Sequence, residues 1–180
     1  MTNWVYPFIN EHYPGVIDYD AKLIAVTTID IETEATGGFP DISLADKQIT
    51  AITLRKGDNV ITLGYFDYTP EADHVVYVKC KDEAELLQKF ITIWCSKQFG
   101  PDIITGWNVE FFDMPYIINR IIRILGDESA KRLSPWGIIS KREVEIVGKT
   151  LVIPVIVGIT ILDYLQLYRK FSFSMQESYK

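Results

Sequence analysis

Two acidic residues interrupt a segment that otherwise favours a buried β-strand, the run Thr27–Thr33 (TTIDIET). The β-branched residues Ile29 and Ile31 favour an extended backbone. Successive side chains along a strand point to opposite faces, so Asp30 and Glu32 share one face. Neighbouring carboxylates repel each other, and ionised carboxylates beside a core are unfavourable unless something neutralises them. A divalent cation, which prefers oxygen ligands, is the usual neutraliser, and the pattern therefore predicts a strand that carries part of a metal site.

A third carboxylate lies in a second phrase, Thr105–Asp113 (TGWNVEFFD), where an expected strand gives way to an expected helix. Asp113 could bind a metal there, or it could cap the helix, because Asp is favoured where helices begin. Asp30 and Glu32 have a similarly simple alternative as solvated acids at a strand edge. Carboxylates drawn together from such distant segments suggest hydrolysis of phosphodiester bonds with two metal ions.

Composition indicates a globular protein and limits how it could meet nucleic acid. The chain has 180 residues, of which 48% are hydrophobic, enough for one domain with a sizeable core. Its formal net charge of −6 argues against binding DNA through overall positive charge, although carboxylates in a metal site are offset once cations bind. Cys80 and Cys95 form no CxxC motif, and the longest apolar run, Leu151–Leu162, is too short to cross a bilayer. We therefore expect a soluble, cytoplasmic protein with no membrane partner.

The order of the expected elements predicts the fold class. Residues 1–21 lack clear periodicity and predict an irregular arm that lies on the domain formed by residues 22–180. Strands are expected at 22–33, 48–54, 59–65, 74–79, 102–105 and 158–162, with a further hairpin over 142–156 that turns at Gly148–Lys149. Helices are expected to open at Asp82, to span 113–125 and to open near Asp163. This order predicts an α/β fold, a ribonuclease H-like mixed sheet flanked by helices, with an extra β-hairpin.

An ordered series of phrases resembles the 3′→5′ exonuclease domain of family B DNA polymerases, especially those of large tailed bacteriophages. Ile29–Glu32 is similar to the first exonuclease motif of that family, and Asn108–Asp113 is similar to the second. The likeness extends through Gly106–Asn108, Pro115–Tyr116, Asn119–Arg120, Ala130–Pro135, Leu162–Tyr164 and Tyr168–Phe173. It covers nearly all of the chain from Lys22 to Lys180, and a series of this kind is far more specific than a lone Asp-x-Glu.

The resemblance implies a set of site residues. Asp30, Glu32 and Asp113 match the catalytic, metal-binding acids of the family, and a complete site would hold two Mg²⁺ or Mn²⁺ ions. Metal chemistry suggests that Asp30 bridges the ions and that Glu32 holds the one that activates water. Phe39 and Asn108 match residues that contact the DNA. Taken alone, Phe39 could be an ordinary core or surface aromatic, and Asn108 an ordinary turn residue.

One departure from the family pattern concerns the last acid. The third motif has a Tyr followed four residues later by an Asp, and no Tyr in the 180 residues has an Asp at that offset. Asp163 stands where a helix is expected to start and is interpreted as its cap. We therefore expect the front portion of an exonuclease domain, weak or inactive on its own. The hairpin over 142–156 resembles the family's strand-separating hairpin, with a short turn.

The resemblance also implies partners. These are a single-stranded or frayed 3′ end of DNA and the remainder of the polymerase, in cis or as a second chain, in a phage-infected bacterial host. One alternative is a non-catalytic half of a split polymerase that acts as a DNA-binding and structural module and needs a partner chain. Another is an independent ribonuclease H-like nuclease whose final acid comes from a neighbouring subunit.

Overall fold

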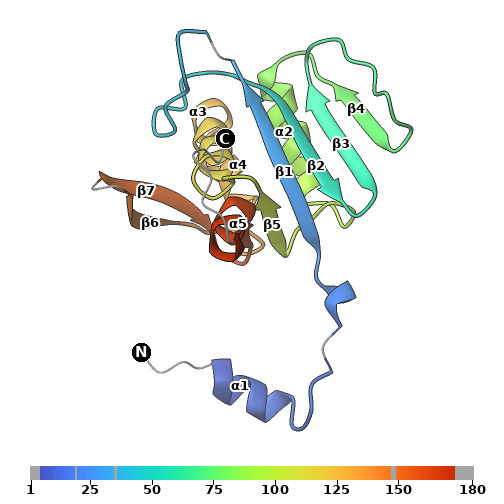
Figure 1. Cartoon of the computed structure of the whole chain (residues 1–180), viewed down its shortest axis with the longest axis vertical. Helices are drawn as coiled ribbons and strands as arrows, with labels where there is room; N and C mark the ends of the chain where they lie inside the picture. The colour runs from blue at the N-terminus through green and yellow to red at the C-terminus, as the bar shows by residue number, and fades with distance from the viewer. Residues whose placement is uncertain (1–4, 19, 35, 147–148, 173–180) are drawn as a thin grey trace.

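A six-stranded mixed sheet forms the body of the protein, in a computed structural model that describes residues 5–18, 20–34, 36–146 and 149–172 (Figure 1). The strand order is β4-β3-β2-β1-β5-β8, and β6 and β7 form a separate hairpin. The strands are β1 (Val26–Thr33), β2 (Ile49–Lys56), β3 (Asn59–Gly64), β4 (Val75–Lys79), β5 (Ile103–Gly106), β6 (Ile139–Ile146), β7 (Lys149–Ile156) and β8 (Thr160–Asp163). The helices are α1 (Val5–His12), α2 (Glu83–Trp94), α3 (Asp113–Leu125), α4 (Asp127–Lys131) and α5 (Tyr164–Phe171).

The sheet is mixed because β2 runs antiparallel to both of its neighbours. It pairs with β1 on one side and with β3 on the other, whereas β1 with β5, β5 with β8, and β3 with β4 are parallel pairs. A two-residue turn joins β2 to β3, and Gly57 adopts there the positive φ of +59° that suits glycine in such turns. The predicted mixed sheet flanked by helices, with its extra hairpin, is confirmed.

Burial alternates along β1 and separates the two faces of the sheet. Thr27, Ile29 and Ile31 are buried, whereas Asp30 and Glu32 are exposed. Helices α2 and α3 pack against the buried side of β1, β2 and β3 and enclose the core with them. Core residues from both layers include Ile29, Leu54, Leu63, Leu86, Phe90, Ile117 and Ile121. The two acids of β1 therefore lie on the open face, away from these two helices.

The N-terminal segment departs from the prediction of an irregular arm lying on the domain. It contains helix α1, where the Phe8 and His12 rings stack one helical turn apart and His12 Nδ1 lies 3.0 Å from the Phe8 carbonyl oxygen. Residues 5–18 are all exposed, and Figure 1 shows α1 standing away from the sheet. Pro7 does not interrupt the helix because it falls in the first turn, where its N–H is not needed.

Three smaller differences concern where two elements begin and one additional short helix. The first strand begins at Val26 rather than at Lys22, because Ala21–Leu23 form a 3₁₀ turn that Asp20 caps by accepting the Lys22 N–H. Helix α4 was not predicted, and it is a short helix directly after Gly126. The hairpin begins at Ile139, and Gly148 in its predicted turn lies outside the described residues.

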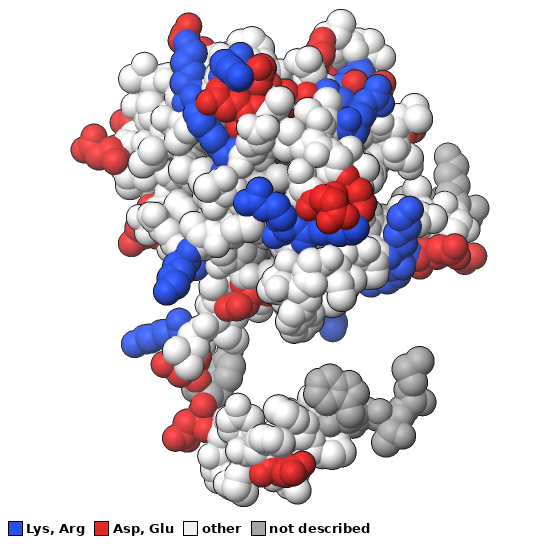
Figure 2. All heavy atoms as spheres, turned by 180° about the vertical axis from the view of Figure 1, so that it is seen from behind, with Lys and Arg blue, Asp and Glu red and all other residues white. Residues whose placement is uncertain are grey.

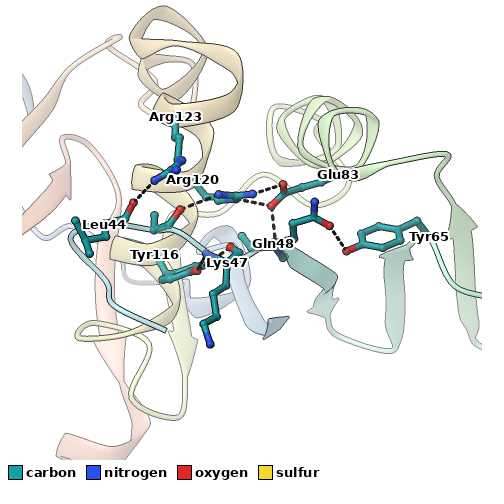
Figure 3. Close-up of polar contacts among 10 residues, drawn as sticks. Leu44, Lys47, Gln48, Tyr65, Glu83, Tyr116, Arg120 and Arg123 are labelled. Atoms are coloured by element: carbon teal, nitrogen blue, oxygen red, sulfur yellow. Dashed lines mark hydrogen bonds and ion pairs between the residues drawn. The ribbon is translucent and has the colours of Figure 1, made fainter. Parts of the chain in front are cut away.

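A buried ion pair holds α3 against α2 and against the loop that leads into β2 (Figure 3). Arg120 Nε and Nη2 each donate to the Glu83 carboxylate at 2.6 Å, and Arg120 Nη1 donates to the Ala45 carbonyl at 2.8 Å. The same carboxylate accepts the Ile49 N–H at 2.7 Å. The Tyr116 hydroxyl fixes the next part of this loop, since it donates to the Lys47 carbonyl at 2.8 Å. Two helices, a loop and a strand thus meet at one charged pair.

Replacing Arg120 with Leu should lower the free energy of unfolding by about 3–5 kcal/mol, because it leaves a buried carboxylate without its partner. The double variant Arg120→Leu with Glu83→Leu should recover part of this loss, because no buried charge then remains. Urea unfolding followed by circular dichroism measures both values. Lys131→Ala, which removes an exposed ion-paired lysine, serves as the control and should leave the midpoint nearly unchanged. An Arg120→Leu midpoint equal to that of Lys131→Ala would contradict the assignment.

Candidate active site

The open face of β1 carries the first two predicted acids. Asp30 and Glu32 lie on this face, two residues apart, as the alternation along the strand predicted. The pairing with β2 shifts register directly after Glu32, at Thr33. Such irregularities bend a strand and redirect its side chains, and they are frequent beside active sites. The two carboxylates therefore stand at the end of β1 where regular pairing stops.

Asp113 reaches the same strand from the side of β5. Strand β5 pairs with β1 only as far as Thr28, and further along the strand the Asp113 carboxylate accepts the Ile31 N–H at 3.1 Å. Asp113 is the first residue of α3, and the N-cap position is held by Phe112, which makes no side-chain capping hydrogen bond. The helix-cap alternative therefore does not describe Asp113, which bonds to β1 instead.

The electrostatics of the site reflect this placement. The pKa of Asp113 is raised to about 7, chiefly by burial and then by the negative charge of nearby Asp30, and hydrogen bonds from the backbone of Ile31 and of Asp113 itself oppose the rise. Burial also raises the pKa of Asp30. A carboxylate pair of this kind gains stability from a proton or a cation, because either one relieves the repulsion and replaces lost hydration.

Gly106 and Asn108 determine the path of the loop between β5 and α3. A Cβ on Gly106 would lie 2.6 Å from the Ile29 carbonyl oxygen, so only glycine permits β5 to end this close to β1. Asn108 has a φ of +59°, which Asn tolerates better than most residues, and its carbonyl accepts the Phe112 N–H at 3.0 Å. Asn108 is thus a turn residue at the site, and its predicted DNA contact stays a prediction.

Asp163 holds the loop between β5 and α3 through hydrogen bonds to its backbone. It is buried, and it caps α5 by accepting the Leu165 N–H at 2.9 Å, as predicted. Its carboxylate also accepts the N–H groups of Asn108 and Glu110 at 3.2 and 3.0 Å. The sequence reasoning missed this second role, because the contacts join residues more than fifty positions apart. Three backbone donors occupy the carboxylate, which makes Asp163 a poor candidate for a fourth metal-binding acid.

Phe39 lies at the surface close to the start of α3. Its side chain is 82% exposed, and its ring centroid is 5.0 Å from that of Phe112, the residue before Asp113. The loop that carries it turns at Gly38, with a φ of +107°, and Lys47 Nζ donates to the Gly38 carbonyl at 2.6 Å. The structure therefore brings this exposed aromatic next to the helix end that carries Asp113.

A basic and an acidic side chain form a pair beside the site, and charges of both signs are mixed on the opposite face of the molecule (Figure 2). Arg142 of the hairpin forms an ion pair with Glu110 of the β5–α3 loop, which ties the hairpin to the site. Figure 2, which views the molecule from behind, shows basic and acidic side chains interspersed on the side of the sheet that α2 covers, opposite the open face of β1 (Figure 1). No helix among the described residues is long and apolar enough to cross a membrane. Charge attraction to a nucleic acid backbone is thus not a dominant feature of the face shown.

The donor chemistry suits a hard divalent cation, although the acids do not form a preformed cluster. Within the described parts of the chain, no group of three His, Cys, Asp or Glu side chains is arranged to hold a metal ion. Asp30 and Asp113 nevertheless interact electrostatically, and Glu32 lies on the same face as Asp30. Carboxylate oxygens are the ligands that Mg²⁺ and Mn²⁺ prefer, so these residues fit part of such a site.

A mixed sheet with acids on its central strand and on the adjoining helix defines a ribonuclease H-like domain of the exonuclease type. The family described as DNA polymerase family B, exonuclease domain, matches residues 9–180, and the chain belongs to this family. Its sequence is similar to the DNA-directed DNA polymerases of Escherichia phage RB69 and Enterobacteria phage T4, each 34% identical over 99% of the chain. The predicted family resemblance is confirmed.

The matches also define how much of a polymerase the chain represents. It spans 23% of the length of each of the two phage polymerases. A more distant likeness, 37% identity over 68 residues, is found to the DNA polymerase catalytic subunit of Psittacid herpesvirus 1, where it covers 37% of the chain and 6% of that subunit. The domain division at residue 22 stays a prediction, and the family match begins earlier, at residue 9.

Replacing Asp113 with Asn should flatten the pH dependence of stability in the absence of metal. With a pKa of about 7 in the folded protein and about 4 when unfolded, Asp113 releases a proton on unfolding between these values. Ionisation of Asp113 therefore lowers the free energy of unfolding as the pH rises from about 4 to about 7, and the loss is complete above about pH 7. Urea unfolding in EDTA at pH 5 and pH 8 measures the difference.

The wild-type protein should lose more stability between these two pH values than Asp113→Asn does. Asp58→Asn, which changes an exposed acid in the β2–β3 turn, is the matched control and should behave like the wild type. Equal pH slopes for Asp113→Asn and Asp58→Asn would show that Asp113 is not a strained carboxyl group.

Proposed function

We propose that this domain removes nucleotides from the 3′ end of single-stranded or frayed DNA, with Asp30, Glu32 and Asp113 holding two Mg²⁺ or Mn²⁺ ions. The observation that carries the proposal is the placement of the Asp113 carboxylate against β1, beside Asp30, with a raised pKa. A buried carboxylate held beside a second one at the cost of repulsion is typical of a cation site. When bound, the cations would supply an activated water and would stabilise the leaving 3′ oxygen.

Asp30, Glu32 and Asp113 would have different roles because they differ in position and exposure. Asp30 is the acid whose charge acts on Asp113, and it shares a face of β1 with Glu32, so Asp30 is the residue that would serve both ions. Glu32 is exposed on the open face, where it could orient water beside a terminal phosphate. Asp113 is 3% exposed and would keep its ion away from bulk solvent. The chain thereby offers one shielded ligand and two more accessible ones.

Phe39 and Asn108 would position the DNA strand. Stacking of a base on an exposed aromatic contributes roughly 1–3 kcal/mol and tolerates every base, as removal of any mispaired nucleotide requires. The Asn108 side chain has both a donor and an acceptor and could bind a phosphate or a sugar hydroxyl. A frayed end would be preferred because unpairing is least costly at a mismatch.

The relatives suggest that the domain acts within a DNA polymerase as its proofreading part. Their names describe DNA-directed DNA polymerases. The 180 residues contain no Tyr-x-x-x-Asp motif, and backbone donors occupy Asp163. We propose that the last acid comes from the remainder of the polymerase, in cis or as a second chain, and that this chain alone turns over slowly.

The same observations favour a second candidate function. A chain with three of the four acids could serve as a non-catalytic half of a split polymerase, a DNA-binding and structural module that a partner chain completes. The two candidates differ in whether the chain alone cleaves DNA.

Mn²⁺ should raise the melting temperature of the protein, and Asp30→Asn should abolish most of this rise, because a bridging ligand is lost. Differential scanning fluorimetry with and without 1–10 mM Mn²⁺, roughly the range in which a weak carboxylate site fills, measures the shift. Asp58→Asn is again the control and should keep the full rise. A rise of equal size in Asp30→Asn would exclude this site as the metal site.

Digestion of a 5′-labelled single strand in Mn²⁺ should shorten it stepwise from the 3′ end, and Glu32→Ala should slow this at least tenfold, because one metal ligand is lost. Cuts inside the strand would contradict the exonuclease proposal. No cleavage, together with an Asp30-dependent Mn²⁺ shift, would favour the split-polymerase module.

A further inference from the structure

Four side chains on one stripe of α3 hold the second half of the loop that carries Phe39. Residues three and four positions apart share one side of a helix. Each of these four donates to a backbone carbonyl of the loop: Tyr116 to Lys47, Asn119 to Ile42, Arg120 to Ala45 and Arg123 to Leu44. Residues 42–47 are therefore fixed to the helix that begins with Asp113.

The first half of the same loop contains a turn, residues 36–38, whose backbone is costly to hold in place. Gly37 and Gly38 have φ values of +80° and +107°, and glycine loses more conformational freedom on folding than any other residue. Residues 36–39 are all exposed, and Pro40 is the first buried residue after them. Core packing therefore contributes little to the position of this glycine turn.

Lys47 provides a polar link to the glycine turn. Its side chain extends away from the buried Arg120–Glu83 pair (Figure 3). Its Nζ donates to the Thr36 carbonyl and, at 2.6 Å, to the Gly38 carbonyl. Hydrogen bonds from a charged donor are stronger than those between neutral groups. One ammonium group thus joins both ends of the turn to the start of β2.

A closed series of contacts connects this ammonium group to the Phe39 ring. The Phe39 ring centroid is 5.0 Å from that of Phe112, which stacks on Tyr116 at 5.7 Å. The Tyr116 hydroxyl accepts the Lys47 N–H at 3.1 Å and donates to the Lys47 carbonyl at 2.8 Å. The Lys47 side chain then returns to Gly38, directly before Phe39. Phe39 is thereby held both through its ring and through the backbone that precedes it.

We infer that Lys47 is a positioning residue for the Phe39 ring, because its ammonium group keeps the glycine turn in the conformation in which that ring can receive a base. The inference rests on the proposed function and deepens it, since Lys47 acts on DNA through Phe39. A loop that is already ordered loses less conformational freedom on binding, which raises affinity. Two carbonyls bind the ammonium group, so its charge serves the loop rather than a DNA phosphate.

The test measures binding of a 5′-labelled oligothymidylate by fluorescence anisotropy, in Ca²⁺ to limit turnover. Phe39→Ala should weaken binding about five- to hundredfold, because the stacking surface is lost. Lys47→Met keeps the length of the side chain but not its ammonium group, and should weaken binding about three- to tenfold, a part of the stacking contribution. Lys47→Arg retains charged donors and should restore most of this loss.

Lys56→Met is the matched control. The Lys56 Nζ also donates to a backbone carbonyl, that of Gly100 at 3.2 Å, but in a loop that carries none of the proposed site residues. This variant should bind the oligonucleotide like the wild type. Melting followed by circular dichroism verifies that each variant is folded.

Two further measurements distinguish positioning from other roles of Lys47. In a Phe39→Ala background, Lys47→Met should have no additional effect, because no ring remains to be positioned. Loss of a phosphate contact would reduce the slope of log Kd against log salt concentration by about 0.7 for single-stranded DNA, whereas Lys47→Met should keep the wild-type slope.

The outcomes separate the two proposals. Undiminished binding by Phe39→Ala, or no binding by the wild type, would overturn the proposed contact of Phe39 with DNA and this inference with it. Weakened binding by Phe39→Ala, together with wild-type binding by Lys47→Met, would overturn this inference alone. A Lys47→Met loss that persists without Phe39, or that reduces the salt slope, would also overturn it, because the lysine would then act on the fold or on a phosphate.

Discussion

The repulsion between the carboxylates of Asp30 and Asp113 is the constraint on which the rest of this domain depends. The negative charge of Asp30 raises the pKa of Asp113, and the two acids would separate if the chain allowed it, but here it does not. Helix α3, which carries Asp113, is packed along its buried face and held through Arg120 to Glu83 of α2. The free energy of core packing and of this ion pair thereby keeps the acids together, which is how a protein prepares a site for a cation in advance.

The loop between β5 and α3 extends that constraint to the neighbouring part of the site. Gly106 lets the chain pass close to β1, Asn108 turns it, and Asp163 holds it through two backbone N–H groups. Asp163 is therefore a structural element of the site. It lowers the cost of an irregular loop by satisfying backbone donors that would otherwise be left without partners.

Periodic patterns in the sequence were sufficient for the elements that carry the acids. Period-two alternation placed Asp30 and Glu32 on one face, and the helix expected over 113–125 has the bounds of α3. Contacts between distant segments had no such signal. The bonds of Asp163 to the loop and of Arg120 to Glu83 depend on how elements meet in space. Helix α1 was missed because it buries no face in the domain, and burial is what creates a readable pattern.

The charge of the domain bears on how it could select its substrate. A chain with a net charge of −6 gains little from counterion release along a DNA backbone. If the proposed site acts on DNA, affinity comes from one phosphate at the cations and from a base stacked on the exposed ring of Phe39. Such binding requires an unpaired end, because a base that is paired within a duplex cannot stack on the ring of Phe39. Weak electrostatic attraction to the DNA backbone would then favour unpaired over paired ends, since paired DNA would make few other contacts at this site.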